Sequence, residues 1–316
     1  MAGLPEDTIP PHGEDPALSE LLAVGEQTRR SLPSQLRHRI GFADPSLFDD
    51  ELVARTRGLL VHLTAQIAGD RPQGSDNPGY REGRDAILRA VFTQPGLLAH
   101  CHALALEYRL TRKLAASAGI DPLLPPLLQE LIASPSEPTS RLCSSFLAAQ
   151  SRFLRDMERM QLPLRQLPAE LLNIALGIGR EQSNDPLMAD AIRQAVQASY
   201  DEGATRVALM QRLVSLPDYP QLRGWQVEQT GVPLFLAGLL PVAGPDYHDV
   251  VLSTTESQMA HLALTLRTRG CNPRVVSRNL LLLHDRTALQ VGASTDPATA
   301  SALLAESAAA HEQDAA

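Results

Sequence analysis

Lysine and aromatic residues are almost absent from this sequence of 316 residues. Lys113 is the single lysine, so arginine carries nearly all of the basic charge. Aromatic residues make up 4% of the chain, which predicts a core built mainly from leucine and other aliphatic side chains. Nucleic acids are bound on basic surfaces, often with stacked aromatic rings. The shortage of such rings and a net charge of -8 therefore argue against a nucleic-acid-binding protein.

Cysteine is scarce as well. Cys101, Cys143 and Cys271 lie far apart, are odd in number and include no CxxC pair. A disulfide framework is therefore not expected, and a reducing compartment fits best. The N-terminus lacks the charged segment and apolar run of a signal peptide. The longest apolar run, 232–244, is too short to span a bilayer and is broken by Pro241. These features predict a cytoplasmic protein with no membrane contact.

The familiar catalytic motifs are missing too. The sequence contains no P-loop, no HExxH, no GxSxG and no EF-hand loop. The segment LGIGREQ, 176–182, has Gln182 where a dinucleotide-binding loop needs a third glycine, and helix-forming residues precede it. We interpret it as the end of a helix with a glycine cap. Neither a cofactor nor a metal ion is expected.

Three side chains that could bind zinc stand together at His100, Cys101 and His102. On a helix, the side chains of residues i and i+2, such as His100 and His102, point about 200° away from each other. Two side chains of one helix can chelate a metal ion only when they are three or four residues apart. Cys101 falls on an apolar stripe. We therefore interpret this segment as a structural helix with a core cysteine and two boundary histidines. His100, together with Glu107, stays a minor candidate site.

Helix signals, by contrast, are abundant. Asp-Pro occurs at 15–16, 44–45, 121–122, 185–186 and 296–297, and Asn-Pro at 272–273. Asp or Asn at the N-cap accepts a hydrogen bond from a free backbone N–H, and proline loses nothing at the next position. Two apolar stripes in 97–114 predict a helix covered on both sides. Helices are predicted over 16–31, 47–68, 84–93, 96–117, 122–133, 138–161, 168–179, 186–202, 204–215, 231–240, 249–269, 273–284 and 297–311.

No convincing series of alternating strands appears, so the predicted fold class is all-α. Short turns between helices predict an irregular array of helix pairs, either a HEAT-like α-solenoid or a large helical bundle. The Asp-Pro starts are unevenly spaced, so a regular repeat is not demonstrated. The predicted organisation is a disordered N-terminus 1–14, an N-terminal helical segment 15–68, a turn-rich linker 69–83, a main helical domain 84–290 with a sub-boundary near 215–224, and a C-terminal helix and tail 291–316.

The most informative surface feature lies in the predicted helix 138–161. Arg152, Arg155 and Arg159 share one face of it, and apolar residues occupy the other. Gln150 projects towards the apolar side, so it requires a buried hydrogen-bond partner. These four residues form the candidate binding site, because a row of arginines can hold the carboxylates or phosphates of a partner. The alternative is a solvated face with local acidic partners.

Three stretches carry a resemblance to a known family. They are LAAQSRFLRDMERMQLPLRQLPAELLNIAL, PGLLAHCHALALEYRLTRKL and VVLSTTESQMAHLALTLRTRGCNP. The matching features include Gln150, Arg152, Phe153, Arg159 and the LPL at 162–164. Over 85–290 the chain resembles uncharacterised helical proteins of alphaproteobacteria, especially sphingomonads, that carry a proteobacterial domain of unknown function. The resemblance implies an all-α fold of HEAT-type helix pairs and no particular activity.

Three functions follow as hypotheses. The first is a non-enzymatic cytoplasmic scaffold or regulator that binds another protein, because helical arrays offer extended surfaces and no catalytic constellation is visible. The second is an enzyme or small-ligand-binding protein whose site forms only in three dimensions, from His100, Glu107, Gln150, His261 or His284. The third is an anion or nucleotide sensor that uses the face of Arg152. The oligomeric state is left open.

Overall fold

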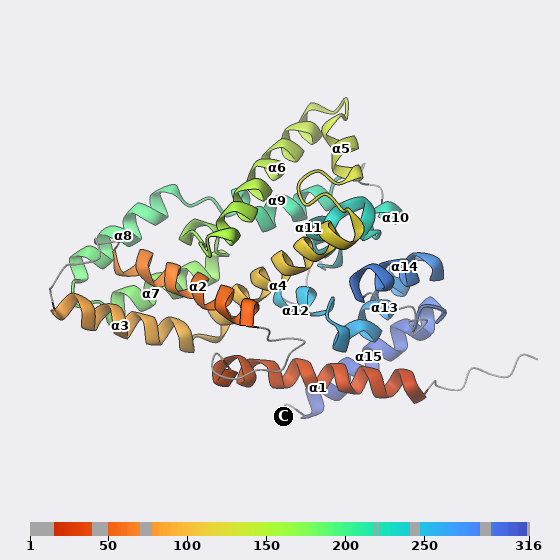
Figure 1. Ribbon diagram of the computed structural model, residues 1–316, viewed down its shortest axis with the longest axis horizontal. Helices are drawn as coiled ribbons and strands as arrows, with labels where there is room; N and C mark the ends of the chain where they lie inside the picture. Colours follow the sequence, from red (N-terminus) through yellow and green to blue (C-terminus); the bar gives the residue numbers. More distant parts are fainter. Residues whose placement is uncertain are drawn as a thin grey trace, which may run out of the picture.

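Helices account for all the regular structure in the described part of the chain, which comprises residues 16–39, 50–69, 78–217, 219, 221–240, 247–284 and 292–314 of a computed structural model. These residues contain no strand, which confirms the all-α prediction, and the helices pack in pairs as an irregular array (Figure 1). The elements, with η for single turns of 3-10 helix, are α1 (Pro16–Arg39), α2 (Asp50–Ala68), α3 (Pro78–Thr93), α4 (Pro95–Ala118), α5 (Pro126–Ile132), α6 (Glu137–Glu158), η1 (Leu164–Gln166), α7 (Ala169–Gln182), α8 (Pro186–Ser199), η2 (Glu202–Ala204), α9 (Arg206–Val214), α10 (Gln221–Gly224), α11 (Val227–Leu239), α12 (Tyr247–Leu252), η3 (Glu256–Gln258), α13 (Met259–Thr268), α14 (Pro273–His284) and α15 (Pro297–Asp314).

Helix α4 runs through the centre of this array (Figure 1). It begins after Gln94, whose side chain accepts a hydrogen bond from Gly96 N at 2.7 Å, and it ends at Gly119, which has a φ of 67°. The helices α2, α3, α6, α7, α11, α12 and α14 all pack against it. Residues 100–108 are buried without interruption. The prediction of a helix covered on both sides is therefore confirmed.

Helices α2, α3 and α7 pack together beside α4. Gly177 and Gly179 lie inside α7, so the prediction that they cap a helix end was wrong. Gly179 instead permits a close approach of two helices, because a Cβ atom at this position would lie 2.6 Å from Cγ2 of Ile67 on α2. Gly177 has open space around it.

The Asp-Pro and Asn-Pro signals identify three helix starts correctly. Asp185 accepts a hydrogen bond from Met188 N at 3.1 Å, and Asn272 accepts one from Val275 N at 3.0 Å. Asp296 accepts hydrogen bonds from two backbone N–H groups at the start of α15. Asp15 and the pair 44–45 lie outside the described residues.

The fourth such signal, at Asp121, does not start a helix. Its carboxylate accepts hydrogen bonds from Leu123 N and Leu124 N and forms a turn. Pro125 then disfavours the helical conformation at the residue before it. Helix α5 therefore begins at Pro126 rather than at 122.

The predicted helix 249–269 is also interrupted, and it divides into α12, η3 and α13. Ser253, Thr254 and Thr255 each donate a side-chain hydrogen bond to the carbonyl three residues earlier. Such bonds compete with the helical hydrogen bonds of the backbone. Three of them in succession mark the end of α12.

One continuous apolar core includes residues on both sides of the predicted linker 69–83. Helix α3 begins at Pro78, inside the predicted linker 69–83, whose residues 70–77 lie outside the described part. Leu59 and Leu63 of α2 are fully buried in the same core as α4, α6 and α9. Helix α1 crosses α13 and α15 and packs through Leu18 and Leu22. None of the described helices is long and apolar enough to cross a membrane.

Candidate functional site

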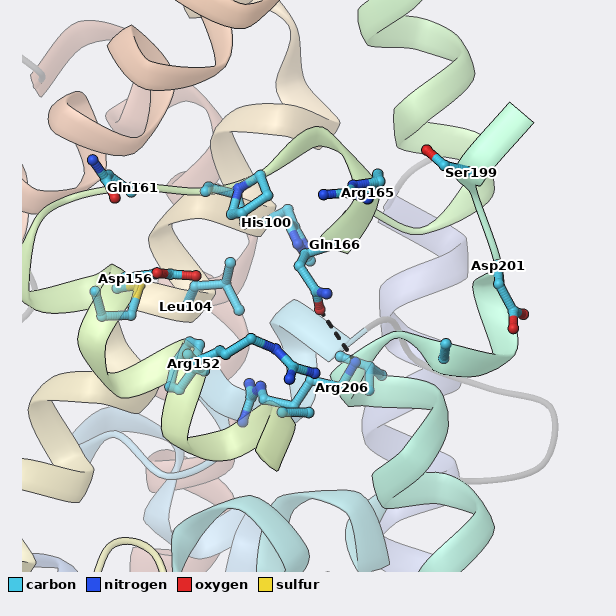
Figure 2. A pocket seen from close by; sticks show the side chains of 17 residues that line it. His100, Leu104, Arg152, Asp156, Gln161, Arg165, Gln166, Ser199, Asp201 and Arg206 are labelled. Carbon is cyan, nitrogen blue, oxygen red and sulfur yellow. Dashed lines mark hydrogen bonds between the residues drawn. The ribbon is translucent and has the colours of Figure 1, made fainter. Parts of the chain in front are cut away.

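A cavity of about 340 Å³ lies between α4, α6, the loop that contains η1, and the start of α9 (Figure 2). Its floor consists of side chains that are almost fully buried, among them His100, Leu104, Met157 and Arg206. Its rim consists of exposed side chains, among them Arg152, Arg165, Ser199 and Asp201. The cavity therefore opens to solvent at a charged rim and ends at a mostly apolar floor.

A buried ion pair supports this floor. Arg206 Nη1 lies 2.7 Å from Glu107 Oε1, and Arg206 Nη2 donates to Oε2 of the same carboxylate, so the pair is bidentate. Tyr247 donates its hydroxyl to Glu107, and Gln150 Oε1 accepts from Arg206 Nη1 at 3.0 Å. The Gln150 amide also donates to Pro122 O at 3.2 Å. The prediction that Gln150 requires a buried partner is thus confirmed.

The pKa values of Arg206 and Tyr247 are both shifted in this buried network. Burial works to lower the pKa of Arg206, but Glu107 and Tyr247 outweigh this effect and raise the pKa above its usual range. Burial, and then the nearby Glu107 carboxylate, raise the pKa of Tyr247 well above its usual value. Arg206 is therefore permanently charged and Tyr247 permanently neutral. The Glu107–Arg206 pair joins α4 to α9, and the hydrogen bond from Tyr247 to Glu107 joins α12 to α4.

Arg206 was missed in the sequence analysis, although its position carries a signal. It is the first residue of α9, and the cap before it is Thr205, whose hydroxyl accepts from Ala208 N at 3.3 Å. A positive charge is unfavourable at the positive end of a helix dipole. An arginine at such a place indicates a compensating carboxylate from elsewhere in the chain. The ring of Phe153, 3.8 Å from the Arg206 guanidinium carbon, adds a cation–π contact.

His100 faces the cavity from α4 (Figure 2). Only 6% of the residue is exposed, and its Nε2 atom has no hydrogen-bond partner among the described residues. Burial, and to a lesser extent the charges of Arg206 and His248, lower its pKa from 6.5 to about 4. The ring is therefore neutral at pH 7, and its Nε2 atom is itself buried.

The neighbouring His102 meets different partners. Its ring lies edge-on to that of His248, with 5.7 Å between the centroids. Both His100 and His102 are buried, so the prediction of two boundary histidines was wrong, whereas Cys101 lies in the core as predicted. Within the described residues, no group of three His, Cys, Asp or Glu side chains is arranged to hold a metal ion.

Helix α2 holds the loop that forms one wall of the cavity. Gln66 donates its amide to Leu162 O at 2.8 Å and accepts from Leu164 N at 3.1 Å. His62 Nδ1 accepts from Leu162 N at 3.1 Å. Met160, which has a φ of 54°, turns the chain out of α6 and packs against Gly58 of α2. These contacts set the position of the loop that carries Arg165 and Gln166 into the cavity wall.

The predicted arginine face is only partly assembled at this site. Arg152 lines the rim, but Arg155 and Arg159 are exposed and do not line the cavity. Helix α6 ends at Glu158, so Arg159 lies in the turn beyond it. Arg165, from the loop after α6, takes their place (Figure 2). In the described part of the chain, neither Arg152 nor Arg165 forms an ion pair.

Three of the five polar residues named for an internal site come together here. His100 lines the cavity, and Glu107 and Gln150 hold the Arg206 side chain that lines it. His284 lines a different cavity of about 170 Å³ near Lys113. His261 lies on α13, away from both.

Comparison of the chain with protein-family models, curated proteins and solved structures found no match in any of the three sets. The candidate site is therefore interpreted from its own geometry, and the resemblance to alphaproteobacterial helical proteins stays a prediction.

Proposed function

We propose that the protein binds a small organic anion in the cavity between α4, α6 and α9. The observation that carries this proposal is the pair of guanidinium groups of Arg152 and Arg165, which stand at the rim of a cavity without an ion-pair partner among the described residues. The volume of about 340 Å³ falls in the range of small-molecule sites, roughly 300–1,000 Å³. Arginine binds carboxylate and phosphate groups through two parallel hydrogen bonds.

The rim also carries acidic side chains, which restrict the anions that fit. Asp201 accepts a hydrogen bond from Gly203 N at 3.0 Å and so stabilises the turn before α9. Asp156 lines the opposite side of the cavity (Figure 2). A ligand that also carries a hydrogen-bond donor is favoured over a bare inorganic anion, because carboxylates can only accept.

Catalysis is the second candidate, and the lining residues favour it less. Ser199 is the hydroxyl residue on the rim, and it donates to the carbonyls of Ala195 and Val196 in its own helix. An activated nucleophile requires a hydrogen-bonded base instead. The scaffold hypothesis stays a prediction.

The proposal is tested by titrating the purified protein with a panel of organic acids and phosphate esters in a calorimeter. Arg152→Gln and Arg165→Gln should each weaken binding by about tenfold or more, since a charge-assisted hydrogen bond contributes about 1.5–3 kcal/mol. Arg155→Gln is the matched control, because Arg155 lies on the same helix but outside the cavity. Equal losses in all three variants, or no binding of any anion, would refute the proposal.

A further inference from the structure

We infer that the anion bound in this cavity is amphipathic, with its charged group at the rim and a hydrocarbon body that extends towards the floor. The inference rests on the proposed function and specifies its ligand class. It starts from Phe153, Pro163 and Val207, which line the cavity and are only half-buried, so they present accessible apolar surface to a ligand. Removing such surface from water is favourable, so a hydrocarbon body strengthens binding here.

The floor continues this apolar surface. Leu104, Met157 and Leu162 line it and are at most 5% exposed. They come from the central helix α4, from α6 and from the loop after α6, so three segments of the chain converge on one apolar end of the cavity. Small-molecule sites are typically lined in this way, with a few polar groups that orient the ligand.

The polar groups in and beside the floor are already engaged or buried. Glu107 and Gln150 hold the guanidinium of Arg206. The side-chain oxygen of Gln166 accepts a hydrogen bond from Arg206 N at 3.3 Å (Figure 2), and the Nε2 atom of His100 is itself buried. A polar ligand group at the floor would therefore lose its water without gaining a partner, which is unfavourable, whereas carbon atoms need no partner.

The positive charge that remains for the ligand lies at the rim. Arg152 and Arg165 are exposed and form no ion pair within the part of the chain that the structure describes. The charge of Arg206 is compensated by Glu107. The anionic group therefore binds at the rim, and the hydrocarbon body is directed inwards.

The test compares two homologous series on the intact protein. The carboxylates are acetate, butanoate and hexanoate, and the phosphate monoesters are methyl, n-propyl and n-pentyl phosphate. Calorimetry measures the dissociation constant of each. Every step adds two methylene groups, and in at least one series it should tighten binding by about four- to fifteenfold, because a methylene group removed from water contributes up to about fourfold. The series that shows this gain tells a carboxylate ligand from a phosphate ligand.

Variants locate the two parts of the ligand. Val207→Asn should weaken binding of the longest member by at least about fivefold and leave the shortest within about twofold, because it removes apolar surface from the cavity wall. Val214→Asn is the matched control, since Val214 is also half-buried on α9 but does not line the cavity. Arg152→Gln should weaken the longest and shortest members by the same factor. A gain with chain length that Val207→Asn leaves intact would contradict the inference.

The outcomes separate the inference from the function on which it rests. If the members of each series bind the wild-type protein equally well, the inference of a hydrocarbon body is wrong and the anion site stands. If no member binds, and no anion of the wider panel does, both are wrong. The wild-type comparison does not depend on any variant folding correctly.

Discussion

Replacing Glu107 with glutamine tests the buried ion pair directly. The substitution keeps the size of the side chain but removes its charge and sets an amide N–H₂ against the N–H groups of Arg206. Glu107 is 0% exposed and Arg206 is 4% exposed, so solvent cannot compensate for the lost partner. Tyr247 loses the charged acceptor of its hydroxyl as well.

The expected magnitude follows from that burial. Removing one partner of a buried pair destabilises a protein by about 3–5 kcal/mol, because the remaining charge is left uncompensated. For a chain of 316 residues, this loss corresponds to a melting temperature lower by about 5–8 °C. Differential scanning calorimetry and urea unfolding, followed by circular dichroism, measure the two quantities.

A surface pair of the same geometry supplies the control. Arg223 binds Glu130 through two hydrogen bonds of 2.7 and 2.8 Å, but the two side chains are 40% and 57% exposed. Glu130→Gln should therefore have a far smaller effect on unfolding. The double variant Glu107→Leu/Arg206→Met should be more stable than Glu107→Gln, because it leaves no unpaired charge. Equal effects of Glu107→Gln and Glu130→Gln would refute the reasoning.

Two further predictions concern packing and pH. Gly179→Ala should destabilise the protein by about 1–3 kcal/mol, since its Cβ would clash with Ile67. Gly177→Ala meets open space and should stabilise the protein by up to about 1 kcal/mol. Equal urea unfolding midpoints for the two variants would contradict the close contact between α7 and α2. Burial holds the pKa of both His100 and His248 at about 4, below the 6.5 of an unfolded chain, so the unfolded state binds protons first and stability is lost as the pH falls from about 6.5 to about 4. His100→Gln should reduce that loss in urea unfolding at pH 7 and pH 4.5, and an unchanged loss would show that His100 titrates normally.

Much of the fold was predictable because helix starts are local. Asp185 and Asn272 each cap a helix with their own side chain, and the helix 273–284 was predicted with the observed ends. The errors arose where two local signals compete. Asp121 and Pro122 form an ordinary cap motif, but Pro125 and Pro126 follow, and the helix begins only at Pro126. The threonines after α12 bond back to the helix and end it.

The site was less predictable because its residues come from distant parts of the sequence. Arg206 lies 99 residues after Glu107 along the chain, and no periodic pattern connects them. Helical spacing grouped Arg152 with Arg155 and Arg159, but of these three only Arg152 lines the cavity. For Arg159 the spacing assumes that the helix continues, whereas it ends at Glu158. Arg165 therefore reaches the cavity by way of a loop, for which periodicity gives no information.

Gln66 fixes the backbone path of the cavity loop without contacting the loop's side chains through hydrogen bonds. A single planar amide binds the carbonyl of Leu162 and the N–H of Leu164, so both of its hydrogen bonds to the loop go to backbone groups. Backbone groups are the same in every residue, so the anchorage does not depend on which side chains the loop carries. Arg165 can therefore be exchanged without displacing the loop, whereas Gln166 also accepts a hydrogen bond from Arg206 N. The selectivity of the cavity can change by substitution of Arg165 while its architecture stays constant. This wall of the cavity is therefore a suitable place to engineer new ligand preferences.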